Sequence, residues 1–169
     1  MKTKLNNLND VLAYQLEGMY YAEKRLQKAL PDCVNHATSS ALKNEIKKYY
    51  ESVRDKRVKL KRIFSYLLTG PFGRKNKMIE KFMEDESKIL KYAKTSELKD
   101  AMIIANMQAI SHYKISTYGT AKAFALTLEL QKVVDLLQEI LEWEKEADRA
   151  FTKVALKHVN EKAATLVAA

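Results

Sequence analysis

The chain has 169 residues, of which 47% are apolar, and it contains only four glycines, two prolines and one cysteine. This length supports one hydrophobic core, the scarcity of glycine and proline disfavours a turn-rich sheet architecture, and a single cysteine excludes an internal disulfide. The net charge is +9 at pH 7, which is high enough that its distribution along the chain matters for the choice of partner.

Apolar residues recur at spacings of three and four, which predicts long amphipathic helices. The first helix is predicted from about residue 5 to 30, and we expect it to stop at Pro31. The second is predicted to begin in the Ala-Thr-Ser-Ser segment 37–40, which is rich in good N-cap residues. It is predicted to end before the Thr-Gly-Pro-Phe-Gly loop at residues 69–73.

A shorter helix is predicted over about residues 76–93, within a long connection between the second and third long helices. Thr95 is predicted to cap the third long helix, which extends to about residue 126, and the last long helix is predicted over about 129–159. The sequence therefore predicts an all-α fold, a ferritin-like four-helix bundle with one extra short helix in the crossover. We expect a single domain over residues 1–169, with its core at about 5–160.

The positive charge is concentrated in residues 43–77, which hold twelve Lys/Arg against three Asp/Glu, whereas the rest of the chain is close to neutral. This segment has the period of an amphipathic helix, so a solvated lysine-rich face is the favoured interpretation and a nucleic-acid partner the less favoured one.

The sequence contains no apolar run near the ~18 residues that a membrane span needs. The N-terminal residues lead into a polar stretch rather than into the apolar centre of a signal peptide. We therefore expect no membrane association and a cytoplasmic location.

Polar residues interrupt the apolar stripe near the middle of each long helix, and we expect them to converge on one buried cluster of Glu23, Lys56, Ser111, Glu144 and Asp148. An unpaired buried charge costs several kcal/mol, so these carboxylates need a metal, protons or lysine beside them. Helical bundles that bind two irons or manganeses use Glu-x-x-His pairs, and the sequence has none.

His112 and Lys114 border the stripe of the third long helix. Imidazole is a common metal ligand, but for a lone histidine at the edge of a helix seam a structural hydrogen bond is the favoured interpretation and ligation the less favoured one. Tyr20, Tyr21, Tyr49, Tyr50 and Tyr113 are interpreted as aromatic packing on the helix seams rather than as redox-active groups, and Tyr118 lies on the stripe of the third long helix.

Several segments, which together extend from about residue 9 to 162, resemble the YciE/YciF-like ferritin-like family of bacterial stress-associated proteins. The matching segments are Ala22-Glu23-Lys24-Arg25-Leu26, Ala29-Leu30-Pro31, Ala37-Thr38-Ser39, Leu42-Lys43, Asp100-Ala101-Met102-Ile103-Ile104-Ala105, His112-Tyr113-Lys114-Ile115, Tyr118-Gly119-Thr120, Leu137-Gln138-Glu139, Glu142-Trp143-Glu144-Lys145 and Asp148. The resemblance implies a rubrerythrin-like bundle, often a homodimer, whose centre can hold a pair of metal ions.

The sequence departs from the family pattern at the implied metal site. Where family members usually read Glu-His-Tyr-Glu on the third long helix, this chain reads Ser111-His112-Tyr113-Lys114 and lacks both carboxylates. On the second helix, Tyr49-Tyr50-Glu51-Ser52-Val53 and Lys56 stand where the family usually has His-Leu-Glu-Glu-Thr and a Gln or His. The ligands that remain are Glu23, Glu144 and Asp148, with His112 retained from the motif, and Lys56 and Lys114 replace ligands.

These departures predict a stress-associated bundle protein with a degenerate di-metal site and no catalytic residues. An empty, salt-bridged centre is the favoured interpretation, and iron or manganese enters only through the resemblance. One alternative is a metal-dependent oxidase or peroxidase of rubrerythrin type, and the other is a nucleic-acid-associated basic bundle. Hydrolase, kinase and dehydrogenase functions lack their sequence motifs. The expected assembly is a homodimer.

Overall fold

The computed structural model describes residues 4–165, and the regular structure in this range is helical, with no strand. The four long helices are α1 (Leu8–His36), α2 (Ser40–Tyr66), α4 (Ser96–Thr127) and α5 (Gln131–Val154). The short helix α3 (Lys77–Tyr92) lies in the connection between α2 and α4. A π-helical turn, η1 (Ala155–Val159), joins α5 to α6 (Asn160–Ala164). The predicted all-helical, ferritin-like four-helix bundle with a short helix in its crossover is confirmed.

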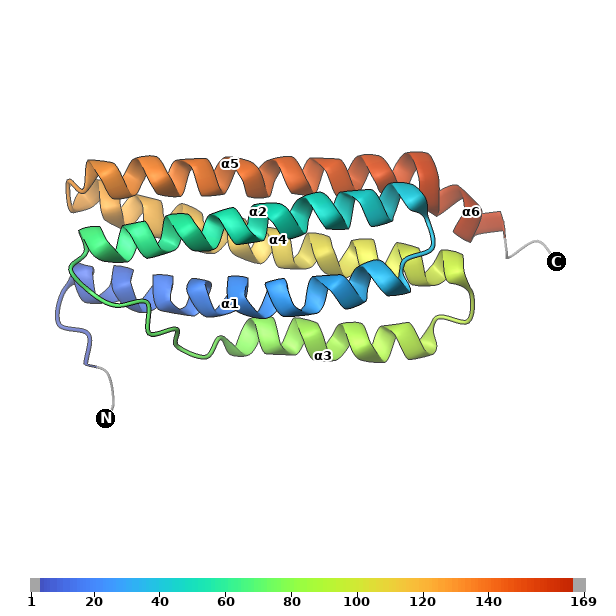
Figure 1. Cartoon of the computed structure of the whole chain (residues 1–169), viewed down its shortest axis with the longest axis horizontal. Helices are drawn as coiled ribbons and strands as arrows, with labels where there is room; N and C mark the ends of the chain where they lie inside the picture. The colour runs from blue at the N-terminus through green and yellow to red at the C-terminus, as the bar shows by residue number, and fades with distance from the viewer. Residues whose placement is uncertain (1–3, 166–169) are drawn as a thin grey trace.

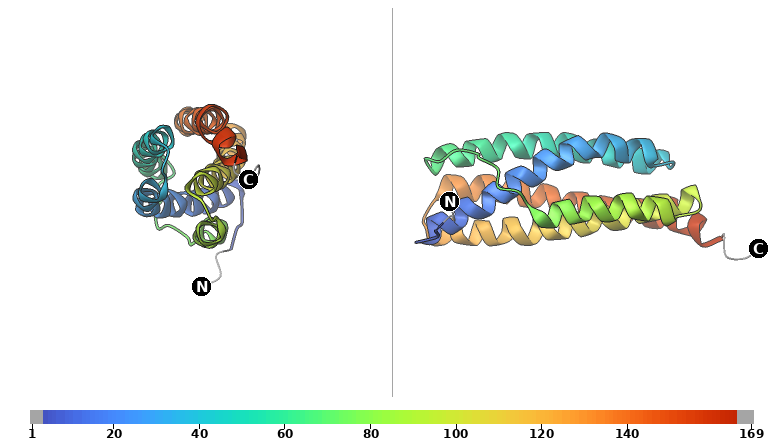
Figure 2. Two further views of the ribbon diagram at one scale, coloured as in Figure 1. Left: turned by 90° about the vertical axis from the view of Figure 1, so that its right-hand side faces the viewer. Right: turned by 90° about the horizontal axis from the view of Figure 1, so that it is seen from below.

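The four long helices form a closed ring around one core. Helix α1 packs against α2 and α4, and α5 packs against the same two helices. The bundle is elongated, as Figure 1 shows, and the end-on view of Figure 2 places α3 outside the ring. Helix α3 packs against α4 and α1, so α4 contacts neighbours on three sides.

Side-chain caps start the helices at the positions that the sequence indicates. The Ser39 side chain accepts a hydrogen bond from the backbone N–H of Leu42, which starts α2 within the predicted segment 37–40. Thr95 caps α4 in the same way, as predicted. At the other end of α4, Glu129 has a φ of 57° and the N–H of Leu130 donates to the carbonyl of Ala125. This left-handed closure delays the start of α5 to Gln131, two residues after the predicted boundary.

The prediction that the first helix stops at Pro31 is wrong, because α1 continues through Pro31 to His36. A proline inside a helix removes one backbone hydrogen bond and costs about 3 kcal/mol. The residues beyond it offset this cost, since Cys33 is buried, Val34 packs against the core and the helix leads to the buried Ala37. Each such burial contributes about 1–3 kcal/mol, so tertiary packing outweighs the local preference.

Candidate functional site

Six polar side chains meet in the middle of the bundle, and we call them the central charge network. Every one of them is at least 98% buried. The network consists of Glu23 from α1, Tyr49 and Lys56 from α2, Lys114 and Tyr118 from α4, and Glu144 from α5.

Helix geometry brings these residues to one layer. Lys114 and Tyr118 are four residues apart, and Tyr49 and Lys56 are seven apart, so each pair lies on one face of its helix. Apolar residues continue the same faces above and below the network, for example Val53 and Leu60 on α2. The network is therefore a polar layer enclosed by apolar core at both ends.

The two lysines bridge the two carboxylates. The ammonium groups of Lys56 and Lys114 both bind Oε1 of Glu144. Nζ of Lys114 also lies 2.9 Å from each oxygen of Glu23. Lys114 thus joins the carboxylate of α1 to the carboxylate of α5, while Lys56 binds only the latter.

The two tyrosines complete the hydrogen bonding. The Tyr49 hydroxyl donates to Oε2 of Glu144 at 3.1 Å and accepts from Nζ of Lys114 at 2.9 Å. The Tyr118 hydroxyl donates to Oε1 of Glu23 at 2.6 Å. As a result, all four carboxylate oxygens accept at least one hydrogen bond, which is what a buried polar network needs to avoid a desolvation penalty.

Burial and charge act in opposite directions on the pKa values of the ionic groups. For Lys114, burial alone would lower the pKa, but Glu144 and Glu23 outweigh it and raise the pKa well above its usual value. For Glu144, burial would raise the pKa, but Lys114 and Lys56 outweigh it and lower the pKa. Lys56 has one carboxylate partner, and there burial prevails and lowers the pKa.

The tyrosines stay protonated far into the alkaline range. Burial, followed by the negative charge of Glu144, raises the pKa of Tyr49, and burial followed by Glu23 raises that of Tyr118. With both lysines protonated, the network has two positive and two negative charges and is neutral. We take Lys56 as protonated at neutral pH because its deprotonation would leave a net negative charge in a layer that water does not reach.

The structure brings most of the cluster predicted from the sequence together, but Asp148 lies outside it. Glu23, Lys56, Ser111 and Glu144 are all fully buried, and within the described residues the hydroxyl of Ser111 has no hydrogen-bond partner.

Asp148 is instead only partly buried, and it binds side chains of α4. Its Oδ1 lies 3.2 Å from Nε2 of His112 and accepts from Gln108 at 3.1 Å. His112 itself is largely exposed. The expectation that Asp148 belongs to the buried cluster is therefore wrong. The reason is that Ala147, not Asp148, takes the next buried position on α5.

Three members of the network are not predicted from the sequence. The sequence predicts Lys114 at the border of the α4 stripe, whereas its side chain is fully buried. The sequence also predicts Tyr49 and Tyr118 as part of the helix seams, whereas both donate hydrogen bonds to the network carboxylates. A signal for the tyrosines exists in the sequence, since each shares a helix face with a lysine at a core position. A phenol beside a buried charge is more useful than a phenyl ring because it supplies a hydrogen bond.

The donor set does not fit a pair of metal ions. The network offers two carboxylates and no imidazole, whereas di-metal sites in such bundles use four carboxylates and two histidines. Across residues 4–165, no three His, Cys, Asp or Glu side chains are arranged so that they could hold a metal ion. The carboxylate oxygens that a metal would need are already bound by ammonium and phenol groups.

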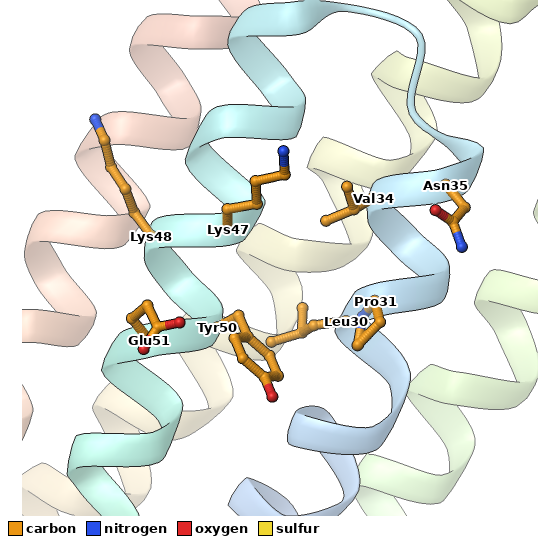
Figure 3. A pocket seen from close by; sticks show the side chains of 8 residues that line it. All are labelled: Leu30, Pro31, Val34, Asn35, Lys47, Lys48, Tyr50 and Glu51. Carbon is orange, nitrogen blue, oxygen red and sulfur yellow. The ribbon is translucent and has the colours of Figure 1, made fainter.

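The structure also has cavities at the surface. One of them, a groove of about 560 Å³ between the second half of α1 and the first half of α2 (Figure 3), contains no residue of the network. Its apolar lining includes Leu30, Val34 and the ring of Tyr50, and Lys47 and Lys48 lie on the α2 side. None of the helices described over residues 4–165 combines the length and the apolar character that a membrane span requires.

Comparison with protein families gives a match over nearly the whole chain. Residues 7–164 match the family model described as a domain of unknown function, DUF892. Among curated proteins, Protein YciF from Escherichia coli (strain K12) is 28% identical over 160 residues, which cover 94% of this chain and 96% of that protein.

Solved structures confirm the bundle and its connectivity. YcfI from Rhodopseudomonas palustris, provisionally described as a structural protein, is 29% identical with a TM-score of 0.89, and the match covers 92% of this chain and 99% of that one. The E. coli stress protein YciF has a TM-score of 0.87 over the same shares. A protein from Xanthomonas campestris pv. campestris, at 16% identity and a TM-score of 0.73 over 96% of this chain and 95% of that one, shares the fold.

Proposed function

This chain belongs to the DUF892 family, and within that family we propose that it is a metal-free, non-catalytic bundle protein associated with stress, whose central charge network replaces a di-metal site. The observation that carries the proposal is the double contact at Glu144, where one carboxylate oxygen receives the ammonium groups of Lys56 and Lys114. These lysines supply the positive charge that metal ions would otherwise bring to buried carboxylates.

The descriptions of the relatives support this proposal. E. coli YciF is described as a stress protein and YcfI provisionally as a structural protein, and neither description names a reaction. A bundle whose centre is an internally satisfied ionic layer suits a structural role, because a buried polar layer fixes the alignment of the helices around it. We also propose that the chain is one domain with its core at residues 5–160, and that the protein is cytoplasmic.

Metal analysis tests the proposal directly. The protein is purified without chelators or immobilised metal, and iron and manganese per chain are measured by mass spectrometry. We expect well below one equivalent of either metal, and a thermal unfolding curve that a chelator does not move. One or more equivalents of bound iron or manganese would refute the proposal and favour the rubrerythrin-type oxidase, whose optical or activity signal would then have to respond to Glu144→Ala.

We further propose that the protein is a homodimer. The groove between α1 and α2 supports this, since Leu30, Val34 and Tyr50 give it an apolar lining that a second copy of the chain would cover. Sedimentation equilibrium of the wild type and of Val34→Lys gives the test. We expect a dimer that the variant dissociates, whereas a wild-type monomer throughout the micromolar range contradicts the homodimer.

A further inference from the structure

A second cavity, of about 350 Å³, lies on the outside of α1 and has no part in the central charge network. It forms where the segment between α2 and α3 passes across α1, a crossing that Figure 1 shows. We call it the basic aromatic pocket, and its lining is Tyr20, Tyr21, Lys24, Arg25, Lys28, Pro71, Phe72 and Gly73.

Positive charge dominates this pocket. Lys24 and Lys28 are four residues apart on α1 and therefore project from the same face. The guanidinium of Arg57 adds a further cation behind one wall, 5.5 Å from the centre of the Tyr20 ring. Arg25 forms an ion pair with Glu80 at 2.7 Å. Within the described part of the chain, Lys24, Lys28 and Arg57 form none. The pocket therefore has a surplus of positive charge that nothing described here neutralises.

Three aromatic rings, those of Tyr20, Tyr21 and Phe72, also line the pocket. Phe72 is 83% exposed, which is unusual for a phenylalanine and leaves its ring without a place in the core. The ring folds back on Gly70, where an added Cβ would lie 2.6 Å from Cζ of Phe72, and the N–H of Phe72 donates to the carbonyl of Gly70 at 2.9 Å. The tight turn thus holds an exposed ring beside the cations.

We propose that the basic aromatic pocket binds a single nucleotide or a closely similar organic phosphate that carries an aromatic ring. Lysine and arginine side chains recognise phosphate, and aromatic side chains stack on heteroaromatic bases, so the two halves of the lining match the two halves of such a ligand. A phosphate without a ring would leave Phe72 uncovered, and a neutral apolar ligand would leave the lysines unused. The volume is at the small end for ligand pockets, which suits one nucleotide better than a strand.

Calorimetric titration of the full chain with adenosine 5′-monophosphate tests the proposal. Adenosine, inorganic phosphate and a short single-stranded oligoadenylate are titrated in parallel. We expect saturable binding of the monophosphate that weakens with salt, and at least about tenfold weaker binding of adenosine and of inorganic phosphate, because each of them makes only half of the contacts. Undetectable binding of the monophosphate at low salt, or inorganic phosphate bound as tightly, would overturn it. An oligoadenylate bound more than about tenfold tighter than the monophosphate would show that the occupant is a nucleic acid instead.

Variants locate the binding. Lys24→Gln/Lys28→Gln is expected to weaken monophosphate binding about tenfold or more, and Phe72→Ala is expected to weaken it several-fold while leaving phosphate binding unchanged. The control Lys153→Gln/Lys157→Gln removes two exposed lysines at the same spacing at the other end of the chain. All of these side chains are exposed, so circular dichroism should show the same fold in each variant. An equal loss in the control, or no loss in Phe72→Ala, contradicts the proposed site.

Discussion

Removal of one charge from the central charge network should destabilise the protein far more than removal of two opposite charges. Lys56→Met keeps the length of the side chain but leaves Glu23 and Glu144 facing Lys114 alone, with a net charge of −1 in a layer that is fully buried. Breaking a buried ion pair in this way costs about 3–5 kcal/mol. For a chain of this size each kcal/mol lowers the melting temperature by about 2–4 °C, so we expect a drop of about 6–20 °C.

The double variant distinguishes charge balance from packing. Glu144→Gln alone leaves a net charge of +1 and should also cost about 3–5 kcal/mol. Lys56→Met/Glu144→Gln restores neutrality, because Lys114 and Glu23 remain paired at 2.9 Å. We therefore expect the double variant to lose less stability than either single variant, so its loss should fall short of the sum of the two single losses by at least about 3 kcal/mol.

Urea unfolding followed by circular dichroism at pH 7 measures these differences without the salt effect of guanidinium. Lys61→Met is the matched control, since Lys61 is exposed on the same helix and its loss should change the free energy of unfolding by less than about 0.5 kcal/mol. If Lys56→Met is as mild as the control, or if the double variant loses the sum of the single losses, the network does not stabilise the fold through its charge balance.

Three further outcomes follow from the same structure. Lys114→Glu should destabilise the metal-free protein by about 3–5 kcal/mol and should recover stability when Mn²⁺ is added, because it places a third carboxylate beside Glu23 and Glu144; no recovery in a melting assay would contradict this. Above about pH 10.5 the unfolded chain loses protons from Lys114 and both network tyrosines while the folded protein keeps them, so stability falls as pH rises, by about 1.4 kcal/mol per pH unit for each group. Tyr118→Phe should therefore flatten the measured slope by about 1.4 kcal/mol per pH unit, and an unchanged slope would show that Tyr118 is not the group that titrates. Asp100→Ala should cost about 3 kcal/mol in urea unfolding, since the Asp100 carboxylate accepts three hydrogen bonds of 2.7 Å from the residues that start α2, and a loss within 0.5 kcal/mol would contradict that role.

The sequence was sufficient to predict the fold because apolar residues recur at helical spacing over long segments. The caps at Ser39 and Thr95 and the interruption around Gly70 are local chemistry, and local chemistry is readable from neighbouring residues. Pro31 shows the limit of this reasoning. Its cost to the helix is local, but the burial of Cys33 that offsets it depends on contacts between α1 and the rest of the bundle.

Only part of the site could be predicted from the sequence, because that prediction also depends on clear apolar stripes. Glu23, Lys56 and Glu144 interrupt stripes that are otherwise clearly apolar, and each lies in the network. Helix α4 is contacted by α1, α3 and α5, so its buried residues surround much of the helix and no single stripe marks the direction of the centre. Lys114 was therefore placed at a border instead of at the centre. Asp148 was misplaced because it lies only one turn from Glu144 on α5 but turns toward α4.

The pKa directions also determine what a metal ion would have to overcome. To reach the oxygens of Glu144 it must displace two ammonium groups, and the lysine that bridges to Glu23 holds its proton more strongly than a free lysine. A displaced Lys114 would keep only Glu23 as its partner and would face the positive charge of the metal ion in a buried layer, which costs several kcal/mol unless it deprotonates. Any metal binding forced at high concentration should therefore strengthen as the pH rises, since proton release then becomes easier. This dependence should weaken in Lys114→Met, where only Lys56 still has a proton to lose. Equal pH dependence of Mn²⁺ binding in the wild type and in this variant would refute the argument that the bridging lysine keeps the centre free of metal.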